Sequence, residues 1–138
     1  MSDDIPSIVE FSVDLSKQEQ PPPLPPADYL GTIREVEVKM SQRDTKYAAI
    51  AFHIGADQYP ADFEEGNPDG TTIIYRRVSL EDNPNARFGC RRFIEAIGGK
   101  LSKKVDTSEW VGMECIVEVD TSEYEGVQRP EIKKVREA

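Results

Sequence analysis

The sequence has only two cysteines, one histidine, one tryptophan and no long apolar run. No segment approaches the roughly 20 apolar residues that a membrane-spanning helix needs. The start, Met1-Ser2-Asp3-Asp4, is acidic where a secretory signal would be basic and then apolar. We therefore expect a cytoplasmic protein with no membrane partner. In that compartment Cys90 and Cys115 would be two buried free thiols, since a disulfide needs oxidising conditions.

Residues that support catalysis or hold a metal ion are equally scarce. A nucleophile needs an adjacent base, and the single histidine, His53, lies among alanines. Two cysteines without a CxxC motif are too few for a zinc site. The acidic stretch from Asp57 to Asp69 lacks the spacing of an EF-hand, and no glycine loop matches a phosphate cradle. We expect a protein that is not an enzyme and has neither metal nor cofactor.

The net charge of −9 opposes binding to nucleic acid, because lysine and arginine make the phosphate contacts. The charge is unevenly distributed along the chain. Residues 1–27 hold five acids and one base, which leaves 16 bases and 21 acids in the remainder. The bases cluster at 39–46, 76–77, 87–92, 100–104 and 129–136, and the acids at 57–69 and 114–125. A surface segregated in this way is compatible with binding a polyanion.

A proline-rich segment divides the chain into an arm and a body. Residues 21–26 include five prolines, which is typical of a stiff polyproline II spacer. Before it, Val9, Phe11, Val13 and Leu15 alternate with polar residues. This pattern fits a strand that adds to a sheet edge, and it fits a mobile tail equally well. We place the arm and linker at 1–27 and one folded domain at 28–138.

Hydrophobic periodicity in the body predicts five strands and one helix. Alternation predicts strands at 29–41, 46–55, 71–80, 113–120 and 127–136. A phase slip beside Gly31 predicts a bend or bulge in the first strand. Between the third and fourth strands, an apolar stripe of Phe88, Cys90, Phe93, Ile94 and Ile97 predicts a helix at 86–97, capped by Asn83 or Asn85. This order is that of the OB-fold, a partly open five-stranded barrel, and a generic α+β sheet is the alternative.

Several short motifs resemble those of phage-encoded single-stranded DNA-binding proteins of the OB-fold type. The opening Pro23-Leu24-Pro25-Pro26-Ala27-Asp28-Tyr29-Leu30-Gly31-Thr32-Ile33 is similar to the family's first strand, although the glycine before the tyrosine is missing. The segments 47–54, 93–99, 110–112 and 124–126 resemble later elements in the same order. The chain ends in Lys133-Lys134-Val135-Arg136-Glu137-Ala138, not in the acidic tail that many replication-type members use to recruit partners. The acidic N-terminal arm could recruit replication or recombination proteins instead.

Single-strand binding needs basic side chains along a groove and aromatic faces on which bases stack. Tyr47 and His53 flank Ala49 and Ala51 on one face of the second strand, which either leaves room for a base or is covered by another segment. Tyr75 next to Arg76-Arg77 is either a stacking site beside a phosphate contact or a core tyrosine beside solvated arginines. One of these adjacent arginines needs a bulge to reach water. The full set of candidate nucleic-acid-binding residues is Lys39, Arg43, Lys46, Tyr47, His53, Tyr75, Arg77, Arg91, Tyr124 and Arg129.

Two other features have a structural and a functional interpretation. Arg87, Arg91 and Arg92 either extend a phosphate track or form a solvated helix face. Trp110, at a loop–strand junction, is expected in the core and not on a binding surface.

The resemblance implies sequence-tolerant binding of single-stranded DNA in phage replication or recombination, in the host cytoplasm. The alternative is an OB-type protein-interaction module, a virion component or inhibitor, without affinity for nucleic acid. The sequence does not determine the oligomeric state, and it is compatible with a homo-oligomer.

Overall fold

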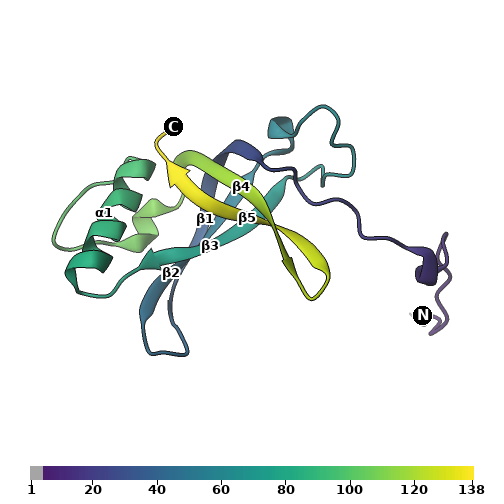
Figure 1. Ribbon diagram of the computed structural model, residues 1–138, viewed down its shortest axis with the longest axis horizontal. Helices are drawn as coiled ribbons and strands as arrows, with labels where there is room; N and C mark the ends of the chain where they lie inside the picture. Colours follow the sequence, from purple (N-terminus) through teal and green to yellow (C-terminus); the bar gives the residue numbers. More distant parts are fainter. Residues whose placement is uncertain (1–4) are drawn as a thin grey trace, which may run out of the picture.

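The computed structural model describes residues 5–138, and the acidic start at 1–4 lies outside them. The described chain forms β1 Ala27–Met40, β2 Lys46–Ile54, β3 Thr71–Ser79, α1 Pro84–Ile97, β4 Glu114–Tyr124 and β5 Val127–Arg136 (Figure 1). Short 3-10 helices lie at Leu15–Lys17, Ala56–Gln58 and Thr107–Trp110. The predicted order of three strands, one helix and two strands is confirmed. Within residues 5–138 no helix is long and apolar enough to cross a membrane.

The five strands form one antiparallel sheet in the order β3-β2-β1-β4-β5. The sheet curls until its two edge strands approach each other, with Cα atoms of β3 and β5 within 8 Å. Arg77 of β3 and Glu131 of β5 join these edges through an ion pair of 3.1 Å. No backbone ladder pairs β3 with β5 within the described residues, so the sheet stays open. The prediction of a closed five-stranded barrel is therefore not confirmed. The prediction of a mostly β fold with one helix after the third strand is confirmed.

Part-way along β1, the alternation of side chains that face the core changes phase. Tyr29 and Ile33 are buried, and beyond them the inward side chain is Val36. The register against β2 shifts between Ile33 and Glu35, which is a β-bulge. The predicted irregularity exists, but it lies after Ile33 and not beside Gly31. The bulge bends the strand so that its first half pairs with β4 and its second half with β2.

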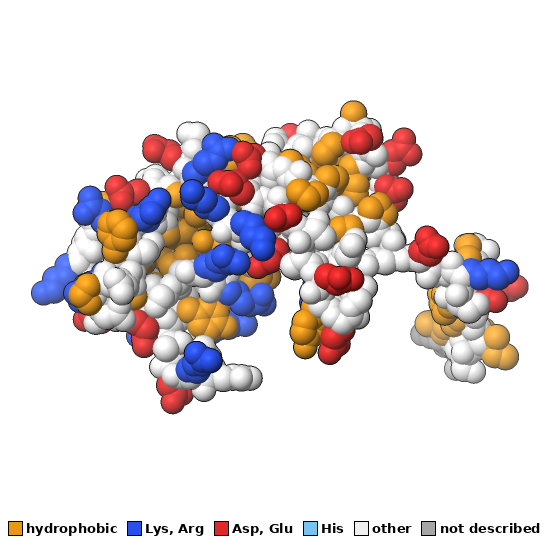
Figure 2. Space-filling model, in the orientation of Figure 1, with side chains coloured by type: hydrophobic (Ala, Val, Ile, Leu, Met, Phe, Trp, Pro, Cys, Tyr) orange, Lys and Arg blue, Asp and Glu red, His pale blue; other side chains and the backbone are white. Residues whose placement is uncertain are grey.

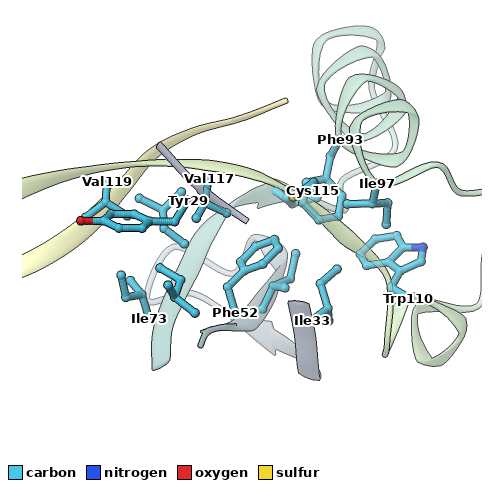
Figure 3. Packing of buried hydrophobic residues seen from close by; sticks show 14 of the residues in the cluster. Tyr29, Ile33, Phe52, Ile73, Phe93, Ile97, Trp110, Cys115, Val117 and Val119 are labelled. Atoms are coloured by element: carbon cyan, nitrogen blue, oxygen red, sulfur yellow. The ribbon is translucent and has the colours of Figure 1, made fainter. Parts of the chain in front are cut away.

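Aromatic side chains occupy the centre of the core (Figure 3). Phe52 of β2 meets Phe93 of α1 edge to face, with ring centroids 6.5 Å apart. Trp110 packs against Phe93 at 5.2 Å and is only 3% exposed. The prediction that Trp110 is a core residue is confirmed. Its ring lies between α1 and the strands, as Figure 3 shows.

Helix α1 begins two residues earlier than predicted, because Pro84 occupies its first turn. The side chain of Asn83 accepts a hydrogen bond from the Ala86 amide at 2.9 Å, and Gly98 ends the helix in the left-handed conformation. Phe93, Ile94 and Ile97 are buried as predicted, but Phe88 is exposed. Five residues turn a helix by about 140° beyond a full turn, so Phe88 cannot share a face with Phe93.

The arm shows no strand within residues 5–26, so the predicted strand pattern at 9–15 does not form one here. Its apolar side chains are all exposed, from 49% for Val13 to 88% for Ile8. The linker, in contrast, packs on the body. Leu24 is buried in the core, and the Tyr29 hydroxyl donates to the Pro25 carbonyl at 2.6 Å. The packed part of the chain thus includes the linker from Leu24 onward.

The acidic stretch 57–70 is a loop, as predicted, and is held by its own aromatic contacts. Tyr59 and Phe63 pack edge to face at 5.3 Å, and the Tyr59 hydroxyl donates to the Asn67 carbonyl at 2.9 Å. This loop therefore presents its carboxylates from a defined position.

The two cysteines are free, and Cys115 is fully buried. Burial raises the pKa of the Cys115 thiol to about 12, against about 8.5 for an unfolded chain. Between these values the unfolded state loses this proton and the folded state keeps it, so the free energy of unfolding falls as pH rises. We expect Cys115→Ala to make this alkaline decline shallower in urea titrations, and Cys90→Ala, at a half-buried site, to change it less. Identical pH profiles for wild type and Cys115→Ala would contradict the assignment.

Candidate nucleic-acid interface

The opening between the two edge strands holds two adjacent hollows, which together we call the β3–β5 seam. It consists of two hollows of about 560 and 590 Å³ that share Tyr75 and Arg77 of β3 in their linings. One hollow continues over Arg92 of α1, and the other continues to Arg129 on the β4–β5 hairpin. The seam thus runs from the hairpin to the helix, along the line where the sheet fails to close.

A bulge in β3 presents both adjacent arginines on the outside of the sheet. Ala48 of β2 is opposite Val78 and Ile50 is opposite Tyr75, so the single residue Ala49 faces both Arg76 and Arg77. Both arginine side chains are consequently exposed. The need for a bulge at this pair follows from the alternation of side chains along a strand, and the structure confirms it.

The seam is basic although the chain as a whole is acidic. Its two hollows are lined by six basic and three acidic residues, a local charge of +3 against −9 for the chain. Figure 2 shows Lys and Arg side chains gathered over α1 and β5 around a hollow with an apolar floor. The six basic residues are Arg76, Arg77, Arg92, Arg129, Lys134 and Arg136.

Only two of these six cations are neutralised by carboxylates. Arg77 pairs with Glu131, and Arg136 pairs with Asp28 and Glu118. Partial burial raises the pKa of Glu131, but the Arg77 hydrogen bond and the nearby Lys133 outweigh this effect and lower the pKa overall. Within residues 5–138 the remaining four form no ion pair, and they are Arg76, Arg92, Arg129 and Lys134. These four are available to phosphates.

Tyr75 lies in the floor of the seam and does not share a face with Tyr47. Its ring stacks on Phe93 at 6.2 Å and meets Phe52 edge to face at 6.3 Å. The side chain is half-buried, and burial raises the pKa of its hydroxyl. Because Tyr75 sits opposite Ile50, on the core side of β2, it is largely a core tyrosine. It offers a nucleic acid only the part of its ring that reaches the two hollows.

The outward face of β2 carries the predicted Tyr47 and His53 with Ala49 and Ala51 between them. Both alanines are only 7% exposed. Across the ladder they face Glu37 and Glu35 of β1, whose carboxylates would repel phosphate. His53 is half-buried, and its Nδ1 atom has no hydrogen-bond partner among residues 5–138. This face is therefore bordered by acids on the β1 side and by Arg76 and Arg77 on the β3 side, so the carboxylates oppose a nucleic-acid backbone along one of its two borders.

The other predicted residues lie outside the seam. Lys39 pairs with Glu37 at 3.3 Å and Arg91 pairs with Glu95 at 3.3 Å, each on its own element. Arg43 and Lys46 are exposed at the β1–β2 turn and the start of β2, and Tyr124 is 67% exposed at the hairpin tip. Of the predicted set, the structure gathers Tyr75, Arg77 and Arg129 in the seam, whereas Lys46 and Arg91 line a separate hollow beside α1.

Four basic residues of the seam are absent from the predicted set. For Arg92 a sequence signal existed, since Gly89, Arg92 and Ala96 follow one another at helical spacing and all line the seam. The bulge predicted at Arg76-Arg77 was the sequence signal for Arg76, because it places both side chains on the outside of the sheet. Lys134 and Arg136 depend on β5 approaching β3 and α1, which no local pattern encodes.

Within residues 5–138 no group of three His, Cys, Asp or Glu side chains could hold a metal ion. Comparisons with known proteins add no assignment to this geometry. A scan against models of protein families finds no match to this chain, and a search of curated proteins finds no significantly similar sequence.

Proposed function

We propose that this chain is an OB-fold domain that binds single-stranded DNA without sequence preference, in phage replication or recombination. The observation that carries the proposal is the β3–β5 seam. It gathers unpaired cations from β3, α1 and β5, and an aromatic ring lies in its floor. Proteins that bind single strands in this way combine a basic groove with aromatic stacking surfaces.

The topology supports the OB-fold assignment. The sheet order β3-β2-β1-β4-β5, the single helix after β3 and the approach of β3 to β5 fit a partly open five-stranded barrel. The bulged β1, which pairs with β4 and then β2, fits the strand that such a barrel shares between its two halves. OB-folds bind oligonucleotides across the second and third strands and the loop between the fourth and fifth. The seam adjoins β3 and that hairpin.

In this proposal the unpaired cations contact phosphates, and bases turn toward the apolar floor and the exposed ring of Tyr124. Carboxylates of the 57–70 loop lie away from α1, as Figures 1 and 2 show, and would repel a strand from that side. The locally positive seam would thus select one path for a polyanion across an acidic molecule.

The test is fluorescence anisotropy of labelled oligo-dT titrated with the full chain at several salt concentrations. Each phosphate contact contributes roughly 0.7 to the decline of log K with log salt for single strands. Four unpaired cations therefore predict a slope of roughly −3. A flat response, or no binding at low salt, would exclude the proposed mechanism.

The second candidate is the OB-type protein-interaction module. The exposed apolar side chains of the arm favour it, since single exposed apolar residues are ordinary but a run of them indicates an interaction site. This candidate predicts no anisotropy change with oligo-dT at any salt concentration.

A further inference from the structure

We propose that the N-terminal arm of one copy of this chain docks into an apolar groove beside α1 of a second copy. The arm here is residues 5–15, and the groove is separate from the β3–β5 seam. This inference goes beyond DNA binding and does not depend on it.

The groove beside α1, called the helix groove below, has a volume of about 1230 Å³, roughly twice that of either hollow of the seam. Its apolar lining comes from β1, α1 and the segment after the helix, and includes Val38, Cys90, Ile94, Leu101 and Val105. Val38, Leu101 and Val105 are each 40–51% exposed. This volume exceeds the usual range for small-molecule sites, about 300–1,000 Å³, and suits a peptide segment.

A free strand edge borders this groove. β1 pairs with β4 only through residues 27–32, and beyond the bulge it pairs only with β2. Over residues 34–40, the edge that faces away from β2 has no partner strand within the described chain. Val38 lies on this stretch and also lines the groove. An extended peptide can add to such an edge and place alternate side chains in the adjoining groove.

The arm has the complementary pattern. Val9, Phe11, Val13 and Leu15 alternate along it, so in an extended conformation they point to one side, and all are exposed. The arm carries two acids, Glu10 and Asp14, and no base. The groove is lined by five bases and three acids, and Lys46, Lys103 and Lys104 form no ion pair within residues 5–138. Apolar pattern and charge therefore match between arm and groove.

The linker directs the arm away from its own groove. Leu24 is buried, and the Gln20 side chain forms two hydrogen bonds with the Gln128 backbone, at 2.6 and 3.1 Å, beside the β4–β5 hairpin. Five prolines in residues 21–26 stiffen the intervening segment. Figure 1 shows the arm leaving on the side of the molecule away from α1. A second copy is thus the favoured source of the groove.

The experiment measures molar mass by light scattering and sedimentation over a range of concentrations, without DNA. The wild-type chain is expected to shift with concentration from its 15.5 kDa monomer mass toward twice that value. An arm variant, Phe11→Ser with Val13→Ser, and a groove variant, Val105→Glu, are each expected to remain monomeric. All three positions are exposed, so folding is expected to persist, and circular dichroism checks this.

Mixing the two variants is the decisive step, because the mixture pairs one intact arm with one intact groove. The mixture is expected to regain dimer mass, with weaker affinity than wild type. As a control, Arg76→Gln with Arg92→Gln and Lys134→Gln alters the seam and should dimerise normally. A wild type that stays monomeric would overturn the proposal, whether the arm folds back on its own chain or binds a different protein. A mixture that stays monomeric would overturn it as well.

Discussion

Replacing Arg76, Arg92 and Lys134 together by glutamine is expected to lower the affinity for oligo-dT at least about 100-fold at low salt. Hydrogen bonds to charged groups contribute roughly 1.5–3 kcal/mol each, so losing even two of three phosphate contacts gives that factor. The salt slope should also shrink by roughly 2, at roughly 0.7 for each lost contact. None of the three side chains forms an ion pair within residues 5–138, so the fold should be unaffected.

The matched control is the triple variant Lys100→Gln, Lys103→Gln and Lys104→Gln. It removes the same charge from the loop after α1, outside the seam, and should bind oligo-dT nearly as well as wild type. Equal losses of affinity in both variants would mean that the net charge of the chain, rather than the seam, governs binding. Normal binding by the seam variant would show that the interface lies elsewhere on the surface. Tyr47→Ala would then test the outward face of β2.

Replacing Trp110 by alanine is expected to lower the free energy of unfolding by about 3–5 kcal/mol, the usual cost of removing a large buried ring. Trp110 is 3% exposed and packs against Phe93, which in turn contacts Phe52 and Tyr75. The cavity would therefore open where α1 meets the sheet. For a chain of this length the loss corresponds to a fall in Tm of roughly 10–20 °C.

Thermal unfolding followed by circular dichroism measures this effect, since the variant lacks the only tryptophan as a fluorescent probe. Tyr124→Ala is the control, because its ring is 67% exposed at the hairpin tip and should change the free energy of unfolding by less than about 0.5 kcal/mol. An unchanged Tm for Trp110→Ala would show that the ring does not support the core. The same variant separates stability from binding, since Trp110 does not line the seam.

Local sequence patterns were sufficient to predict the secondary-structure elements and the position of some individual side chains. Alternation places all five strands, because a half-buried strand must repeat every two residues. The helix follows from the change of period, and the sequence narrows its N-cap to Asn83 or Asn85, of which the structure uses Asn83. The burial of Trp110 and the bulge at Arg76-Arg77 were also predictable, since each depends on the residues immediately around it.

The candidate site was predictable only in part, because its residues meet through the fold. Arg92 of α1 and Lys134 of β5 are 42 positions apart in the sequence and line one hollow with Tyr75. Lys39 and Arg91 looked equally suitable, yet each is paired with a carboxylate on its own element. The sequence left Tyr75 as either a stacking site or a core tyrosine, and the strand order turns it toward Phe93. Such outcomes depend on which strands become edges and how far the sheet curls.

The sequence by itself determined the kind of chain this is, namely five strands, one helix, an arm with an alternating apolar pattern and a stiff linker. Periodicity and backbone chemistry act over a few residues, so they can be read along the chain. Only the tertiary structure decided that Leu24 joins the core, that the sheet stays open between β3 and β5, and that four unpaired cations line this opening. These features are set by long-range strand pairing, which depends on the packing of the whole core rather than on any single segment.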